Sequence, residues 1–260
     1  MIRTIPPVDR EALKRGLRRL KLRHMREDLE DINELALQEE PSYMDFLGYL
    51  VLSEIEGRNR IQRENRLKSA RFPSYRTLND FDFAFQNSIS RQTLLDLAQL
   101  QFLESRENVI LLGPPGVGKT HLAVALGIEA INAGYRVQFT TAHDLADHLY
   151  SALADGTVGQ VMNKLLRNDL IILDELGYIH LDATGSDHLF QLVAKAYERR
   201  SLIVTSNLDF QDWGHLFDQP ATAAAFLDRL LHHAHVISLK GDSYRIRHRL
   251  TPPAVPSPIN

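Results

Sequence analysis

The stretch of sequence that determines the fold runs from Asn108 to Thr120 and reads NVILLGPPGVGKT. After its first residue it has four apolar residues, typical of a buried strand, and it ends in a glycine-rich loop with the pattern GxxxxGK[ST]. An amphipathic pattern typical of a helix follows over residues 121–133. A phosphate-binding P-loop requires a strand, this loop and a helix in that order. The sequence therefore predicts a nucleotide site in an α/β domain.

The residue types of this loop suit phosphate binding. Its glycines allow a tight turn in which backbone N–H groups point at phosphate oxygens, and the helix that follows adds the positive end of its dipole. We expect Lys119 to reach the β- and γ-phosphates and Thr120 to hold Mg²⁺, so the predicted ligands are ATP and Mg²⁺. The residues predicted to contact the nucleotide are Gly113, Pro114, Pro115, Gly116, Val117, Gly118, Lys119, Thr120 and His121.

Two other apolar runs also end in polar residues. Residues 170–173 lead into Asp174, predicted to orient the Mg²⁺ shell, and Glu175, predicted to polarise an attacking water. The alternative is that these are simply two acids exposed at a strand end. The presence of a P-loop in the same chain argues against this alternative. Residues 202–205 are followed by Asn207, which is predicted to point toward the γ-phosphate. An asparagine that simply ends a strand is the alternative.

Two arginines late in the chain could supply the positive charge that a γ-phosphate needs during its transfer. Arg229 lies in an amphipathic pattern typical of a helix, and Arg245 lies near the C-terminus. From residue type alone, a surface arginine is the commoner interpretation of either.

Two other clusters are interpreted as structural. His232, His233 and His235 lie close together, but no carboxylate pattern for zinc accompanies them, so we interpret them as structural or interface residues. Three phenylalanines alternate over residues 81–85, and core packing explains them better than stacking on a base.

The organisation after residue 90 indicates a doubly covered parallel sheet. Short apolar runs alternate with amphipathic stretches, which is typical of strands separated by helices that cover both faces. The expected sheet has five strands in the order 5-1-4-3-2, so the fourth strand lies between the P-loop strand and the Asp174 strand. The predicted strands are residues 109–112, 137–140, 170–173, 202–205 and 236–239.

The N-terminal part of the chain is predicted to be all helical. Residues 9–70 carry helical periodicity, with Asp9 as a candidate N-cap, and Pro73 breaks the pattern. The expected division is a helical domain at residues 1–72 for DNA or partner binding, a linker and packing segment at 73–90, a nucleotide domain at 91–250 and a disordered proline-rich tail at 251–260.

Charge is distributed in blocks that the net charge of −3 conceals. Residues 10–26 contain eight Lys or Arg and one acid, whereas residues 27–45 contain eight acids and no Lys or Arg. The basic block either contacts phosphates of nucleic acid or pairs with the acidic block, and charge alone does not decide between these. The chain has no cysteine, which excludes disulfides, thiol catalysis and iron–sulfur clusters. With no apolar run approaching 18 residues and no secretory signal, we expect a cytoplasmic protein.

The motifs together resemble an AAA+ ATPase, and more narrowly the IstB-type ATP-binding proteins of bacterial insertion sequences. The resemblance covers about residues 9–250. Besides the P-loop, the segments that carry it are Phe81-Asp82-Phe83, Asp174-Glu175-Leu176-Gly177-Tyr178, Thr205-Ser206-Asn207-Leu208, Phe210-Gln211-Asp212-Trp213-Gly214 and Asp228-Arg229-Leu230-Leu231-His232-His233.

The resemblance implies an initiator-clade AAA+ domain with an extra helix, for which residues 156–168 are the candidate. It implies an ATP hydrolase that assembles on duplex DNA as a homo-oligomer, with ATP sites at subunit interfaces, and that stimulates a partner transposase. Arg229 would act on the ATP of a neighbouring subunit and Arg245 within its own. The basic residues that would then meet DNA phosphates, largely without sequence preference, are Lys14, Arg15, Arg18, Arg19, Lys21 and Arg23.

Two alternatives share the same core. A DnaC-type helicase loader would bind a replicative helicase through its N-terminal segment and prefer single-stranded DNA. An ATP-gated DNA scaffold would bind ATP and hardly hydrolyse it, although Glu175 argues against a site without hydrolysis.

Overall fold

The computed structural model describes residues 9–177 and 182–250 and divides the chain into two compact units, residues 1–65 and 66–260. The division falls inside helix α4 (Tyr43–Ala70), before the predicted boundary at residue 72. The proline-rich tail predicted to be disordered, residues 251–260, lies outside the described residues. None of the helices in the described ranges combines the length and apolar character needed to cross a membrane.

The first unit is helical, as predicted. Asp9 caps its first helix, because an oxygen of the Asp9 carboxylate accepts a hydrogen bond from the backbone N–H of Glu11 at 2.8 Å. A small core of Leu17, Leu29 and Leu50 holds the helices together. The helices of this unit are α1 (Arg10–Arg19), α2 (Arg23–Glu27), α3 (Leu29–Glu39) and the first part of α4.

A buried polar contact adds to this small core. Glu54 is 5% exposed, and its carboxylate accepts hydrogen bonds from the Met25 backbone N–H at 2.9 Å and from Arg58 Nε at 2.6 Å. Burial alone would raise the pKa of Glu54, but these bonds outweigh it and hold the pKa below the ordinary glutamate value. The charged form of Glu54 therefore stabilises the fold near neutral pH, and this contribution is lost as the pH falls through the lowered pKa.

We expect Gly57→Ala to destabilise the N-terminal unit by about 1–3 kcal/mol, because overpacking a filled site forces its neighbours to shift. A Cβ on Gly57 would lie 2.1 Å from Cγ of the buried His24 ring. Gly48→Ala on the same helix is the matched control, since a Cβ there meets nothing within 4 Å and gains up to about 1 kcal/mol of helix propensity. Hydrogen exchange over residues 10–39 measures the stability of this unit in both variants. Equal protection in Gly57→Ala and Gly48→Ala would contradict the prediction.

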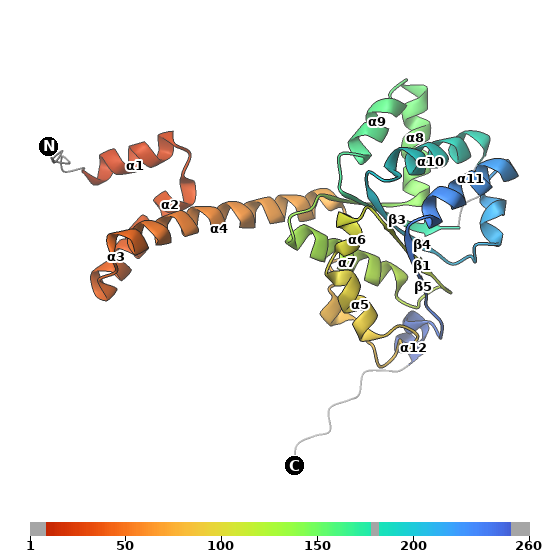
Figure 1. Cartoon of the computed structure of the whole chain (residues 1–260), viewed down its shortest axis with the longest axis horizontal. Coiled ribbons are helices and arrows are strands. Elements are labelled where there is room, and N and C mark those ends of the chain that lie inside the picture. Colours follow the sequence, from red (N-terminus) through yellow and green to blue (C-terminus); the bar gives the residue numbers. More distant parts are fainter. Residues whose placement is uncertain (1–8, 178–181, 251–260) are drawn as a thin grey trace, which may run out of the picture. The chain divides into compact units, whose positions relative to one another are not determined.

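The second unit is built on a five-stranded parallel sheet with the order β2-β3-β4-β1-β5, as predicted (Figure 1). The three inner strands β3, β4 and β1 are buried along nearly their whole length, whereas the edge strands β2 and β5 are partly exposed. The strands are β1 (Asn108–Leu112), β2 (Val137–Thr141), β3 (Leu170–Leu176), β4 (Ser201–Ser206) and β5 (Ala234–Ser238).

Both faces of the sheet are covered, because successive side chains of β1 enter different cores. Val109 and Leu111 pack in one core with residues of α5, α6 and α7, whereas Ile110 and Leu112 pack in the other with residues of α8, α10 and α11. The helices and 3₁₀ turns of this unit are η1 (Leu78–Asp80), α5 (Arg91–Ala98), α6 (Gln101–Glu104), α7 (Lys119–Asn132), α8 (Ala142–Ala154), α9 (Val158–Leu165), α10 (Ala183–Ala196), η2 (Asp212–Leu216), α11 (Pro220–Leu231) and α12 (Tyr244–Leu250).

Two details of the sequence-based assignment are tested by these bounds. The candidate extra helix within residues 156–168 is present as α9. The last strand begins at Ala234 rather than at the predicted Val236, because as an edge strand it mixes exposed and partly buried residues instead of forming an apolar run. Helix α11 ends at Leu231, so His232 and His233 lie in the turn that follows it.

Candidate nucleotide-binding site

The glycine-rich loop connects β1 to α7, and its backbone needs glycine. Gly113 and Gly118 have φ angles of 144° and 99°, in the region that side chains disfavour. A Cβ on Gly113 would lie 2.2 Å from the Leu239 carbonyl oxygen, and one on Gly118 would lie 2.7 Å from the Phe81 ring. The loop therefore fits closely against its own domain on both sides.

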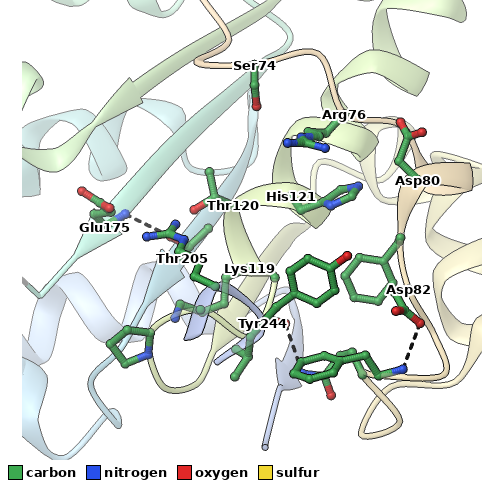
Figure 2. A pocket seen from close by; sticks show the side chains of 18 residues that line it. Ser74, Arg76, Asp80, Asp82, Lys119, Thr120, His121, Glu175, Thr205 and Tyr244 are labelled. Carbon is green, nitrogen blue, oxygen red and sulfur yellow. Dashed lines mark hydrogen bonds between the residues drawn. The ribbon is translucent and has the colours of Figure 1, made fainter. Parts of the chain in front are cut away.

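A cavity of about 320 Å³ opens beside this loop (Figure 2). The loop and the start of α7 line the cavity, the latter through Lys119, Thr120 and His121. Glu175 and Thr205, from the ends of β3 and β4, line it as well. Ligands of open parallel sheets bind at this edge, beyond the carboxyl ends of the strands.

Lys119 lies largely buried in the loop. Its Nζ donates hydrogen bonds to the carbonyl oxygens of Gly113 at 2.6 Å and Pro114 at 2.8 Å. Burial lowers the pKa of Lys119; the Asp174 carboxylate acts in the opposite direction, and Arg245 lowers the pKa further. Because a charge interacts more strongly in a buried, less polar environment, the Lys119 ammonium gains more interaction energy from an approaching polyanion than an exposed ammonium would.

Three oxygen-bearing side chains meet at the ends of the two central strands. Thr120 Oγ1 lies 3.0 Å from both carboxylate oxygens of Asp174, which is 3% exposed. Thr205 Oγ1 donates to Asp174 at 2.5 Å and accepts from the backbone N–H of Glu175 at 3.0 Å. A hydroxyl and a carboxylate in contact are the hard oxygen donors that Mg²⁺ prefers, so this pair fits that ion.

Glu175 is oriented differently from its neighbour. Its side chain is exposed and lines the cavity, whereas that of Asp174 is buried. The backbone of Glu175 has a φ of 61°, and β3 and β4 lose their regular register between Leu173 and Leu176. The two adjacent carboxylates therefore differ in place: that of Asp174 contacts Thr120, whereas Glu175 is among the residues that line the cavity (Figure 2).

Asn207 does not line the cavity. It follows β4, and its Oδ1 is buried without a hydrogen-bond partner among the described residues. This oxygen lies 3.0 Å from the point where a Cβ on Gly177 would be. Thr205, two residues earlier, lies against Asp174 instead. Sequence reasoning treated Thr205 only as the end of a strand, although a hydroxyl at the carboxyl end of the central strand was a usable signal.

The two candidate arginines are placed apart. Arg245, in the first turn of α12, lines the cavity beside the P-loop. Arg229 does not: its guanidinium lies 5.0 Å from the centre of the Phe190 ring, and its Nη1 donates to the Ala225 carbonyl at 3.1 Å. Arg229 instead lines a separate small pocket, together with Glu198.

Segment 73–90 forms a wall of the cavity, which sequence reasoning did not find. Phe81 is buried, which confirms the expected core packing, and it also lines the cavity. Phe85 lines the cavity too, and its ring meets that of Tyr244 edge-on at 5.2 Å between ring centres. The Gln86 side chain donates to the Val117 carbonyl at 3.1 Å. Nε2 of His121 lies 2.8 Å from the Thr77 carbonyl oxygen. This segment is thus attached to the P-loop directly.

The predicted DNA-contacting residues divide into two groups. Lys14 pairs with Glu30 at 3.0 Å and Arg23 with Glu27 at 2.8 Å, as the plainer interpretation of paired blocks requires. The other four are exposed side chains of the first unit, namely Arg15, Arg18, Arg19 and Lys21.

Solved structures share the fold of this chain. The chain resembles DnaI, with a TM-score of 0.55 and 22% identity over 63% of this chain and 90% of DnaI. It also resembles DnaA of Aquifex aeolicus bound to AMPPCP, with a TM-score of 0.52 and 24% identity over 68% of this chain and 55% of that one. The strand order and the P-loop together give the fold of an AAA+ domain.

Comparison with protein families gives a narrower assignment than the fold does. The model of the family described as IstB-like ATP binding protein matches residues 15–252. The chain is 43% identical to an ATP-binding protein of insertion sequence IS21 from Pseudomonas aeruginosa, over 90% of this chain and 88% of that protein. It is 38% identical to the corresponding protein of IS5376 from Geobacillus stearothermophilus, over 92% of this chain and 96% of that one. The chain belongs to the IstB-like ATP-binding family, which confirms the resemblance inferred from its motifs.

Proposed function

We propose that this chain binds ATP with Mg²⁺, hydrolyses it, and uses the ATP-bound form to assemble on duplex DNA and engage a partner transposase of an insertion sequence. The observation that supports this most directly is the contact of the P-loop with the acidic end of β3, through Thr120 and Asp174. The names of its relatives, ATP-binding proteins of insertion sequences, support the setting. Such a protein works in the bacterial cytoplasm, where the DNA lies.

In the proposed mechanism, the loop N–H groups and Lys119 hold the phosphates. Lys119 exchanges its bonds to the Gly113 and Pro114 carbonyls for bonds to phosphate oxygens. Thr120 and Asp174 would hold the Mg²⁺, which neutralises charge on the phosphates when bound. Glu175, exposed to the cavity, accepts a proton from the attacking water. Arg245 adds positive charge from the same chain.

Arg229 lies outside this cavity, so its proposed role needs a second subunit. In an oligomer with ATP sites at subunit interfaces, the residue can reach the ATP of a neighbouring chain. To do so it has to leave the Phe190 ring, which it now covers. Asn207 is assigned the role of orienting the γ-phosphate, and it would have to turn toward the cavity.

The proposed DNA contact is made by the exposed basic residues of the first unit. Four of the six candidates, Arg15, Arg18, Arg19 and Lys21, are exposed, and none of the four forms an ion pair within the described residues. Contacts of this kind bind phosphates without reading bases and weaken as salt rises. They suit a protein that accepts many target sites.

Particle mass on duplex DNA tests this function. We expect large ATP-dependent assemblies of the full chain in Mg²⁺, stronger at low salt than at moderate salt, by mass photometry. Lys119→Ala is the control and should form none, because it lacks the charge that binds the phosphates. Assembly only on single-stranded DNA, or only with a replicative helicase, would favour the helicase loader. Assembly without ATP turnover would favour the scaffold.

A further inference from the structure

A cluster of possible metal ligands lies on the surface away from the nucleotide cavity. Glu198, in the turn before β4, meets His232 and His233, in the turn before β5. One ligand atom from each of the three side chains lies within 4.8 Å of the others, and all three residues are exposed. The two imidazole rings are 4.1 Å apart between centres.

We propose that Glu198, His232 and His233 bind a single divalent cation of the zinc class. The histidines alone gave no reason to expect a metal, because no acid accompanies them in a sequence pattern typical of zinc. Folding supplies that acid, since β4 and β5 lie on either side of β1 and bring the two turns together at one end of the sheet. Two imidazoles and a carboxylate are a recurrent zinc ligand set.

The distances are close to those that a metal would require. Zinc binds nitrogen at about 2.0–2.1 Å, so neighbouring ligand atoms of a tetrahedral site lie about 3.3 Å apart. The three ligand atoms lie within 4.8 Å of one another. To reach the spacing of a tetrahedral zinc site, each would have to move by on the order of 1 Å. Their exposed side chains can do this by small rotations. Three protein ligands leave a fourth position for water.

A neighbouring tyrosine orients one of the ligands. Tyr197 Oη lies 2.9 Å from Nδ1 of His232. A metal-bound imidazole places its second ring N–H against an oxygen in this manner, which fixes the ring and leaves the other nitrogen for the metal. In His232 that other nitrogen is Nε2. Tyr197 is therefore a positioning residue for the proposed site.

The ligand set and its surroundings limit which cation can bind. Mg²⁺ and Ca²⁺ prefer oxygen ligands, whereas imidazole suits zinc, cobalt and nickel. Arg106, Arg200 and Arg229 line the small pocket beside Glu198 and His233, so positive charge lies close by. A cation held mainly by charge would be repelled there, and one held by nitrogen coordination is less affected. The site lies apart from Thr120 and Asp174, the pair proposed for Mg²⁺.

Cobalt absorption tests the proposal, because visible bands of Co²⁺ report coordination by protein nitrogen. The full chain, without a histidine tag, is titrated with Co²⁺ in excess Mg²⁺ and ADP, so that the nucleotide cavity is already filled. We expect one Co²⁺ per chain, displaced by Zn²⁺. Glu198→Gln, His232→Ala and His233→Ala should each weaken binding by at least about tenfold, and Tyr197→Phe by about tenfold.

The matched control is His143→Ala, which removes an exposed imidazole 3.6 Å from Asp147 and should change nothing. Because all three proposed ligands are exposed, their variants should bind ADP as the parent does, which shows that they are folded. The proposal is overturned if the parent binds no Co²⁺ saturably, if the bands survive in the His232→Ala/His233→Ala double variant, or if His143→Ala removes them.

Discussion

Glu175→Gln should bind ATP as tightly as the parent chain and lose hydrolysis by on the order of 10²–10⁴-fold, the usual contribution of a general base. Glutamine keeps the shape of the side chain but cannot accept a proton from water. Binding should survive because the Glu175 side chain faces the cavity, while the contact of this residue with Thr205 is made by its backbone N–H. Phosphate release measures the first property and titration with a fluorescent ATP analogue the second.

Two controls make this result specific. Lys119→Ala should lose nucleotide binding as well as hydrolysis, because its Nζ lies inside the loop at 2.6 and 2.8 Å from two loop carbonyls. Glu104→Gln changes an exposed glutamate outside the cavity and should leave both properties unchanged. A Glu175→Gln chain that hydrolyses ATP at the parent rate would remove this residue from its assigned role.

Arg229→Ala is expected to lower hydrolysis in the DNA-bound assembly by about 10³-fold or more, the effect of removing an arginine that acts on a transferred phosphoryl group. Binding of ATP to a single chain should hardly change, because Arg229 does not line the cavity of its own chain. Arg199→Ala, which removes an exposed arginine of the same unit, is the matched control. Hydrolysis is measured with saturating duplex DNA.

Mixing two inactive variants tests whether Arg229 acts between chains. A Glu175→Gln chain binds ATP without hydrolysing it and keeps Arg229, and an Arg229→Ala chain keeps an intact ATP site. When the two are mixed on DNA, some interfaces combine an intact ATP site with an intact arginine. Hydrolysis should therefore reappear in the mixture. If the mixture stays as inactive as its components, Arg229 does not act on the neighbouring chain.

The core of the site was predictable because its signals are local. The P-loop lies within one short stretch, and Asp174 and Glu175 follow a strand whose apolar run is uninterrupted. The strand order expected for the sheet is also confirmed. In these cases, a few adjacent residues determine both the backbone conformation and the chemistry.

The remaining features depend on contacts between distant segments. Thr205 becomes part of the site only because β4 lies beside β3, which brings its hydroxyl to Asp174. Phe85 lines the cavity only because the segment that carries it is attached to the P-loop through Gln86. Similarly, Glu198 reaches His232 across strands that are separate in the sequence. No spacing in the sequence reports such approaches.

The Thr205 hydroxyl has one further consequence. Its single proton is used in the hydrogen bond that it donates to Asp174, and its oxygen accepts a hydrogen bond from the backbone N–H of Glu175. A cation that draws the Asp174 carboxylate toward itself would pull on this hydroxyl, and the pull would pass to the backbone that carries Glu175. If Asp174 holds the metal and Glu175 is the base, as proposed, Thr205 would couple the two events: binding of the cation at one carboxylate would adjust the position of the other.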